Sequence, residues 1–276
     1  MLGSDYTGVL VDLDGVVYVG EEPVVGALEG IAELRARDVP LRFVTNNSSS
    51  TRAEIRARLE RLGIDADEDE IVSAAWATRQ YLDEAGYDSV FVVGTDSLRA
   101  VLREAGLEVD GEDPAAVVVG HDETTTYEEL TVATRLVDEH DLPLVAVNAD
   151  AAVPTAEGIV PGVGAITSVI ETATGADATV VGKPEPRLFE FAVDSLGTND
   201  VAMVGDTPSA DVRGAKRAGI GSILVAAHAT QQPGDPTPDA VIRDLRGLFD
   251  PAYVVSDADD PDAGDVLDTT DVSDER

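Results

Sequence analysis

The feature that most limits how this chain can fold is a series of short apolar runs, each followed directly by a cluster of polar residues. Residues 8–13 run into Asp12-Leu13-Asp14-Gly15, and residues 41–44 run into Thr45-Asn46-Asn47. Residues 25–37, between these runs, carry apolar side chains at helical spacing. A strand, a helix and a second strand in this order predict a parallel sheet.

The same alternation continues to about residue 226. Helical patterns alternate with short apolar runs, and capping residues or glycines stand at many of the junctions. Helices are predicted at residues 51–62, 74–84, 97–105 and 127–139, and strands at residues 71–72, 89–93, 116–119, 144–147, 180–181, 201–204 and 222–226. The stretch from about residue 85 to residue 179 is a candidate second domain, inserted into the first.

Charge is the most unusual property of the composition. The chain has 54 acidic and 19 basic residues, a formal net charge of -35. This excess argues against nucleic acid as a partner, because such binding needs basic patches. Molar salt screens the self-repulsion, since the Debye length falls to about 3 Å. We therefore hypothesise a halophilic protein of a salt-rich cytoplasm; the alternative is an ordinary acidic protein with an acidic tail.

Other compositional features exclude whole classes of protein. No apolar stretch is long enough to span a membrane, and the N-terminus lacks the pattern of a secretory signal. The absence of cysteine excludes disulfides, thiolate metal sites and cysteine nucleophiles. A cytoplasmic protein with no membrane partner is expected.

Four polar clusters each follow a predicted strand: Asp12 to Gly15, Thr45 to Asn47, Gly182 to Pro184, and Gly205 to Asp211. These clusters contain the residues that are predicted to carry the chemistry. The carboxyl ends of strands in an open parallel sheet border the ligand crevice, so these clusters are expected to converge there. Asp12, Asp14 and Asp206 would form an oxygen-only site that suits Mg²⁺. Lys183, one of only two lysines, would offset phosphate charge, and Thr45 would donate a hydrogen bond.

Such a site suits phosphoryl transfer, where positioning and charge neutralisation provide most of the rate. Asp12 is the predicted nucleophile, and an aspartyl-phosphate is the expected intermediate. Asp14 would protonate the leaving alcohol and later deprotonate the attacking water.

In chain order, the clusters resemble the four motifs of the haloacid dehalogenase (HAD) superfamily. The middle block resembles the large C2-type cap of the NagD-like, p-nitrophenyl phosphatase-like branch. The residues that carry the resemblance are Asp12 to Val16, Thr45 to Ser48, Gly182 to Pro184, Gly205 to Asp211, Gly120 to Asp122, Thr126-Tyr127, Asn148 to Asp150, Pro154 and Pro161 to Gly164.

The resemblance implies roles for individual residues. Asp12 and Asp206 would bind Mg²⁺ by side chain and Asp14 by its backbone carbonyl, while Asp211 would support the metal shell. Phosphate would be bound by Thr45, Asn46 and Lys183. The implied partner is a small phosphorylated metabolite, with p-nitrophenyl phosphate, nucleoside monophosphates, phosphoglycolate and sugar phosphates as candidate substrates. Caps of this branch often contribute to dimer contacts, so a homodimer is a further expectation.

The fold class expected on these grounds is α/β: a doubly wound, Rossmann-like HAD core with an inserted α+β cap. The expected boundaries are residues 1–84 and 180–255 for the core, 85–179 for the cap, and 256–276 for an acidic disordered tail. Two alternative functions stay open, a non-catalytic sensor of a phosphorylated metabolite and a phosphotransferase to an alcohol.

Several polar residues are left outside the predicted site. Asn148 and Asp150 would form either an Asx turn or a substrate contact, and the turn is the preferred interpretation. Gly162 to Gly164 is interpreted as a turn re-entering the core, and Pro184 as the start of a helix ending at Leu196. The three histidines, His121, His140 and His228, have no metal-ligand spacing and are expected to be structural or solvated.

Overall fold

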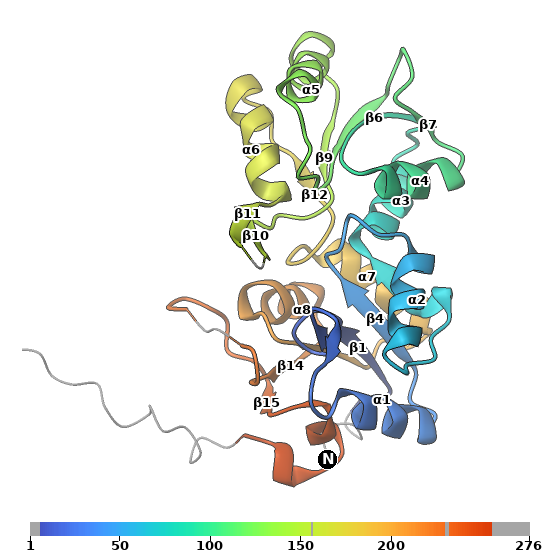
Figure 1. The fold of residues 1–276 in the computed structure, drawn as a ribbon, viewed down its shortest axis with the longest axis vertical. Coiled ribbons are helices and arrows are strands. Elements are labelled where there is room, and N and C mark those ends of the chain that lie inside the picture. Colours follow the sequence, from blue (N-terminus) through green and yellow to red (C-terminus); the bar gives the residue numbers. More distant parts are fainter. Residues whose placement is uncertain (1–5, 156, 230–231, 256–276) are drawn as a thin grey trace, which may run out of the picture.

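The computed structural model describes residues 6–155, 157–229 and 232–255, which form two lobes, each around its own parallel sheet (Figure 1). The core sheet has six strands, and every neighbouring pair is parallel. Its order is β15 (Ala240–Ile242), β14 (Gly221–Val225), β13 (Val201–Gly205), β1 (Gly8–Asp12), β4 (Leu41–Thr45) and β5 (Ile71–Ser73).

The core sheet is wound in both directions from its centre. From β1 the chain moves outward to β4 and β5, and it later returns beside β1 as β13 before moving outward again to β14 and β15. The order therefore reverses between β1 and β13, and a crevice is expected where strand order reverses. The predicted α/β, doubly wound class is confirmed.

Helices cover both faces of the core sheet because alternate strand residues point to opposite sides. Val9 and Val11 of β1 pack in the cluster that holds α1 (Ala27–Ala36) and α2 (Arg52–Arg61). Leu10 packs on the other face. That face carries α3 (Ala74–Glu84), α7 (Pro186–Leu196) and α8 (Arg213–Ala218). Thr51 caps α2 in a reciprocal pair with Glu54, as its Thr-x-x-Glu sequence favours.

The second lobe has a five-stranded sheet with all strands parallel. One face packs on α4 (Asp96–Glu104), the other on α5 (Tyr127–His140) and α6 (Val163–Thr174). Its strand order is β12 (Thr179–Val180), β9 (Leu144–Ala146), β8 (Ala116–Val119), β6 (Ser89–Val93) and β7 (Glu108–Val109). Smaller elements are the hairpins β2 (Tyr18–Val19) with β3 (Glu22–Pro23) and β10 (Ala152–Thr155) with β11 (Gly158–Pro161), and the short helices η2 (Glu68–Glu70), η3 (Pro208–Val212), η4 (Leu245–Leu248) and η5 (Pro251–Tyr253).

One apolar cluster connects the lobes. It contains Leu10 of the core sheet, Leu82 of α3 and Val118 of the second sheet, all buried. Helix α3 contacts both α4 and α7. The lobes are therefore packed together on one side and border a cleft on the other.

Two interpretations from the sequence were wrong. Helix α7 begins at Pro186, not Pro184, with Glu185 as its N-cap. Gly162 to Gly164 is not a turn into the core; Gly162 is the N-cap of α6, a helix missing from the sequence-based prediction. Glycine and β-branched residues are poor helix formers, but the apolar face of α6 packs on the second sheet. The predicted acidic tail lies outside the described residues.

Candidate active site

The predicted clusters meet at the reversal of strand order, where a cleft of about 480 Å³ separates the two lobes. Asp12 is the last residue of β1, Thr45 is the last of β4, and Asp206 directly follows β13. Lys183 lies on the segment that returns from the second lobe to the core. Of the predicted site residues, the cleft is lined by Asp12, Asp14, Thr45, Asn46 and Lys183.

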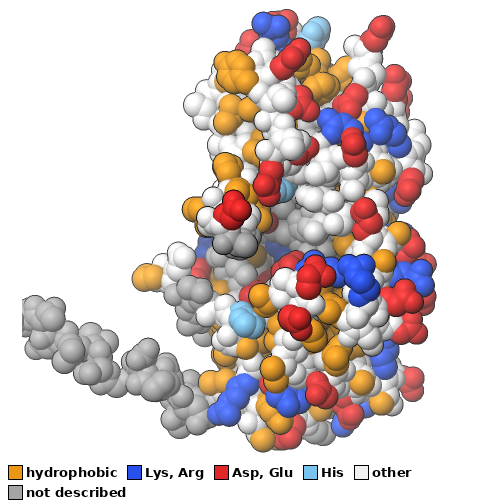
Figure 2. Space-filling model, viewed as in Figure 1, with side chains coloured by type: hydrophobic (Ala, Val, Ile, Leu, Met, Phe, Trp, Pro, Cys, Tyr) orange, Lys and Arg blue, Asp and Glu red, His pale blue; other side chains and the backbone are white. Residues whose placement is uncertain are grey.

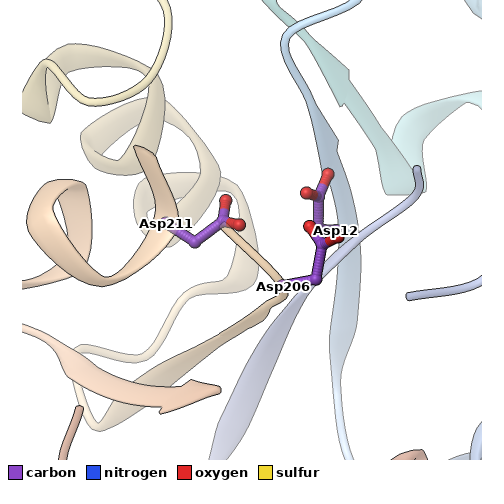
Figure 3. A group of neighbouring side chains, drawn as sticks. All are labelled: Asp12, Asp206 and Asp211. Carbon is purple, nitrogen blue, oxygen red and sulfur yellow. The ribbon is translucent and has the colours of Figure 1, made fainter. Parts of the chain in front are cut away.

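Three carboxylates lie together beside this cleft. Asp12, Asp206 and Asp211 each place an oxygen within 4.8 Å of the others, and Asp211 points toward the other two (Figure 3). Gly15 has a φ of 84°, and a Cβ there would lie 2.0 Å from Asp206 Oδ2. At Gly205 a Cβ would lie 2.2 Å from Asp211 Cγ. Glycine is therefore needed at both positions for the carboxylates to approach the backbone.

Lys183 is the cation of this cluster. Its side chain is buried, and its Nζ lies 2.9 Å from Asp12 Oδ1 and 2.8 Å from Asp211 Oδ1. Burial alone would lower the pKa of Lys183, but the two carboxylates raise it above its ordinary value. Lys183 is therefore charged at neutral pH and fixes the position of Asp12.

The cluster still holds more negative than positive charge. Burial, followed by the charge of Asp211, raises the pKa of Asp206 to about 6. Burial also raises the pKa of Asp12, against the opposing effect of Lys183. Three carboxylates and one ammonium leave an excess that a divalent cation would neutralise, and oxygen-only donors suit Mg²⁺ or Ca²⁺. The residues present thus fit a hard divalent metal.

Asp211 differs from the other two carboxylates because both of its oxygens already have partners. Oδ1 accepts the Lys183 ammonium at 2.8 Å, and Oδ2 accepts the backbone N–H of Thr207 at 3.0 Å. This bonding holds Lys183 and the loop that carries Asp206. Both oxygens of Asp211 are therefore engaged by groups of the protein.

Asp14 occupies the turn after β1, and its side chain is open to the cleft. The turn is closed by a hydrogen bond from Gly15 N–H to the Tyr18 carbonyl, 2.9 Å long. Partial loss of hydration raises the pKa of Asp14, against the lowering effect of Arg58. A carboxyl group with a raised pKa is suited to proton transfer.

Asn46 uses its side chain to hold the Lys183 backbone. Its Oδ1 accepts the Lys183 N–H at 2.8 Å, and its Nδ2 donates to the Lys183 carbonyl at 3.1 Å. The same Nδ2 lies 3.1 Å from Asp150 Oδ1. At Gly182 a Cβ would lie 2.7 Å from Asn46 Oδ1, so glycine is required at this position for Asn46 to form these hydrogen bonds with the Lys183 backbone. Thr45 is buried and accepts the Asn47 N–H at 3.1 Å.

The second lobe contributes residues that the sequence analysis left out of the site. Asp150 N–H donates to Asn148 Oδ1 at 3.1 Å, so the predicted Asx turn is confirmed. Both residues nevertheless line the cleft, and Asn148 Nδ2 donates to the Asn46 carbonyl at 2.7 Å. His121 also lines the cleft, and its backbone N–H donates a hydrogen bond to Ser48 Oγ at 3.1 Å. No local pattern marks these contacts, because they join residues far apart in sequence.

Comparison with known proteins gives consistent similarities. Residues 9–108 match a family described as haloacid dehalogenase-like hydrolase, and residues 180–248 match one described as HAD-hydrolase-like. Acid sugar phosphatase of Staphylococcus haemolyticus is 40% identical over 231 residues, which cover 82% of this chain and 88% of that protein.

Two solved structures have the same architecture. The p-nitrophenyl phosphatase from Archaeoglobus fulgidus has a TM-score of 0.83 and 32% identity, covering 88% of this chain and 97% of its own. A glycerol phosphate phosphatase from Mycobacterium tuberculosis, in complex with calcium, has a TM-score of 0.82 and 32% identity, covering 90% of this chain and 76% of its own.

In the described part of the chain, no helix is long and apolar enough to cross a membrane.

Proposed function

The chain belongs to the haloacid dehalogenase-like hydrolase family and is a phosphatase of phosphate monoesters, and we propose that Asp12 is the nucleophile of this hydrolysis. The observation that carries the proposal is the pairing of Asp12 with Lys183 at the reversal of strand order. Asp12 Oδ1 accepts hydrogen bonds from Lys183 Nζ, at 2.9 Å, and from the Leu13 N–H, at 2.8 Å. The described residues give no hydrogen bond to Oδ2, so this oxygen is available for attack on phosphorus.

The reaction has two displacement steps. Asp12 Oδ2 forms a bond to phosphorus, the ester P–O bond breaks, and the leaving oxygen takes a proton from Asp14. Asp14, now ionised, then removes a proton from water, which attacks phosphorus and releases phosphate from Asp12. Lys183 would neutralise phosphate charge, and Thr45 and Asn46 would bind the phosphate together with it.

Asp14→Asn is expected to slow both proton transfers while leaving Asp12 intact. Loss of a general acid and base costs about 10²–10⁴-fold in rate. With p-nitrophenyl phosphate, whose leaving group needs little protonation, the second step should be impaired more than the first. A rapid burst of nitrophenol followed by slow turnover is therefore expected in stopped-flow absorbance. A variant that turns over at the wild-type rate would remove Asp14 from the mechanism.

The cofactor proposed is Mg²⁺, held by the side chains of Asp12 and Asp206 and the backbone carbonyl of Asp14. The fit rests on the oxygen-only donors and on the excess negative charge of the cluster. When bound, Mg²⁺ supplies positive charge that stabilises the transferring phosphoryl group. Asp211 is engaged by Lys183 and Thr207 and would support the site from behind.

Asp206→Asn is expected to have opposite effects on stability with and without metal. The raised pKa of Asp206, about 6, means that its contribution to folding is present below the ordinary pKa of 3.8 and is lost as pH rises through 6. At pH 8 in EDTA the variant should therefore melt about 2 °C higher than wild type. In Mg²⁺ the order should reverse. Differential scanning fluorimetry measures both, and equal metal-induced shifts in the two proteins would contradict the ligand role.

We also propose that the protein works in a salt-rich cytoplasm. Acidic side chains are spread over both lobes of the viewed face (Figure 2). Their repulsion is screened at high ionic strength. The melting temperature is therefore expected to rise by several degrees between dilute buffer and molar KCl, with Mg²⁺ held constant. An unchanged melting temperature would favour an ordinary acidic protein.

The domain organisation is proposed in the same terms. Residues 85–179 would act as a cap that closes on residues 1–84 and 180–255 and excludes water during turnover.

A homodimer is also proposed. Sedimentation analysis in molar KCl tests it.

The experiment that tests the function is phosphate release from a panel of metabolite phosphate esters in molar KCl. Turnover that requires Mg²⁺ and disappears in EDTA is expected. Release of inorganic phosphate in the presence of an alcohol, without transfer to that alcohol, would separate hydrolysis from phosphotransfer.

A further inference from the structure

The position of the Asp14 carboxylate depends on its backbone. Among the described residues, no hydrogen bond reaches this carboxylate, whereas the carboxylate of Asp12 is held by Lys183 at 2.9 Å. Asp14 lies in the turn after β1. The Gly15 N–H donates to the Tyr18 carbonyl at 2.9 Å across this turn, and a backbone bridge pairs Asp14 with Tyr18. A contact that fixes Tyr18 therefore also fixes the turn that carries Asp14.

Tyr18 is the first residue of the hairpin of β2 and β3, which is very short. Its strands pair Tyr18 with Pro23 and Val19 with Glu22. A two-stranded hairpin of this kind is marginally stable in water unless it packs against another element. Tyr18 is buried, but residues 19–22 are exposed. The hairpin therefore needs contacts from a neighbouring element to stay in one position.

Arg58 of α2 supplies such contacts to both parts of the hairpin. Its guanidinium carbon lies 3.8 Å from the centroid of the Tyr18 ring, and its Nη2 donates to the Gly20 carbonyl in the hairpin turn. The Arg58 side chain is only 24% exposed, which strengthens a cation–π contact. Its third neighbour, the Glu21 carboxylate at 4.0 Å, is largely exposed and contributes little.

We propose that Arg58 is a positioning residue, which holds Asp14 in place for proton transfer by fixing the β2–β3 hairpin to α2. The helix is itself fixed, because Ile55 and Leu59 are buried in the core. Neither Arg58 nor Tyr18 is among the described residues that line the cleft, so Arg58 acts through the hairpin and not on the substrate. The inference rests on the proposed function, in particular on the role of Asp14.

The charge of Arg58 acts in the same direction as its contacts. Burial raises the pKa of Asp14, and of the two cations that oppose this effect, Arg58 has the larger influence and Lys183 the smaller. The guanidinium therefore also attracts the carboxylate. Proton transfer requires the two heavy atoms to lie about 2.6–3.2 Å apart. A displacement of about 1 Å can reduce the rate about 100-fold, so small movements of the hairpin matter.

The test compares kcat/KM in Mg²⁺ for phenyl phosphate and p-nitrophenyl phosphate. Phenolate is a much stronger base than nitrophenolate, so its departure depends more strongly on a proton from Asp14. The ratio of the two values, phenyl over nitrophenyl, is measured in wild type, Arg58→Met, Asp14→Asn and the double variant. The matched control is Arg61→Met, which changes an exposed arginine of the same helix. A ratio within one preparation does not depend on the fraction of protein that is folded.

Arg58→Met is expected to lower the ratio about tenfold, while Arg61→Met leaves it unchanged. Asp14→Asn should lower the ratio at least as far, and the double variant should show no further fall, because Arg58 acts only through Asp14. An unchanged ratio in Arg58→Met, or a fall in the double variant equal to the product of the two single effects, would overturn the inference and leave the role of Asp14 intact. An unchanged ratio in Asp14→Asn would overturn both.

Discussion

Asp12→Asn is expected to reduce phosphate release by about four orders of magnitude or more, the scale seen when a nucleophile or its activating partner is removed. The amide keeps the shape of the side chain but cannot attack phosphorus. It also loses the charge that pairs with Lys183, although Lys183 keeps Asp211 as a partner at 2.8 Å. The fold is therefore expected to survive, and release from p-nitrophenyl phosphate in Mg²⁺ measures the loss.

The matched control for this variant is Asp194→Asn, which makes the same chemical change at an exposed position of α7 in the core lobe. It should retain wild-type turnover. Residual activity of Asp12→Asn within tenfold of wild type, with the fold verified by circular dichroism, would rule out Asp12 as the nucleophile.

Lys183→Met should have the largest effect on stability. Methionine matches the length of lysine but leaves Asp12 and Asp211 buried without their cation. Loss of one partner of a buried pair costs about 3–5 kcal/mol in the free energy of unfolding. In a chain of this size that corresponds to a melting temperature roughly 10 °C lower. Turnover should also fall at least about 100-fold, because phosphate charge is no longer offset.

The pH dependence of this loss follows from Asp12. Without Lys183, nothing opposes the effect of burial, which raises the pKa of Asp12 in the folded state further, so the folded state favours the protonated form of Asp12. The stability deficit of the variant should therefore be small near pH 5 and should grow as pH rises toward 8. Thermal melts in EDTA across this range measure it without interference from metal.

The other lysine of the chain provides the control. Lys216 lies at the surface, with its Nζ 3.1 Å from Asp239 Oδ1. Lys216→Met should change stability by less than about 1 kcal/mol, as for exposed ion pairs generally. Equal destabilisation by the two substitutions would show that the buried position of Lys183 has no special importance.

Most of the core and the positions of the site residues could be predicted from sequence because both depend on local patterns. The apolar runs that became β1, β4 and β13 end within one residue of their predicted ends, since hydrophobic burial and polar loops define these strands. Once strand ends are placed in a doubly wound sheet, Asp12, Thr45 and Asp206 must face one crevice.

The contribution of the second lobe could not be predicted in the same way. The hydrogen bonds of Asn46 with Asn148 and Asp150 join residues more than 100 positions apart. The Asx turn at Asn148 was visible in sequence, but a turn pattern does not indicate which surface it faces. Helix α6 was missed because its stability comes from packing rather than from helix propensity.

The most direct test of the account is to capture the phosphoryl group on Asp12. Asp14→Asn, which should accumulate the intermediate, is mixed with p-nitrophenyl phosphate and Mg²⁺, quenched in acid and treated with borohydride, which reduces an acyl phosphate to an alcohol. Peptide mass spectrometry should then find homoserine at position 12 only when substrate was present. Modification of a different residue, or an unmodified Asp12 in a sample that released nitrophenol in a burst, would contradict the mechanism.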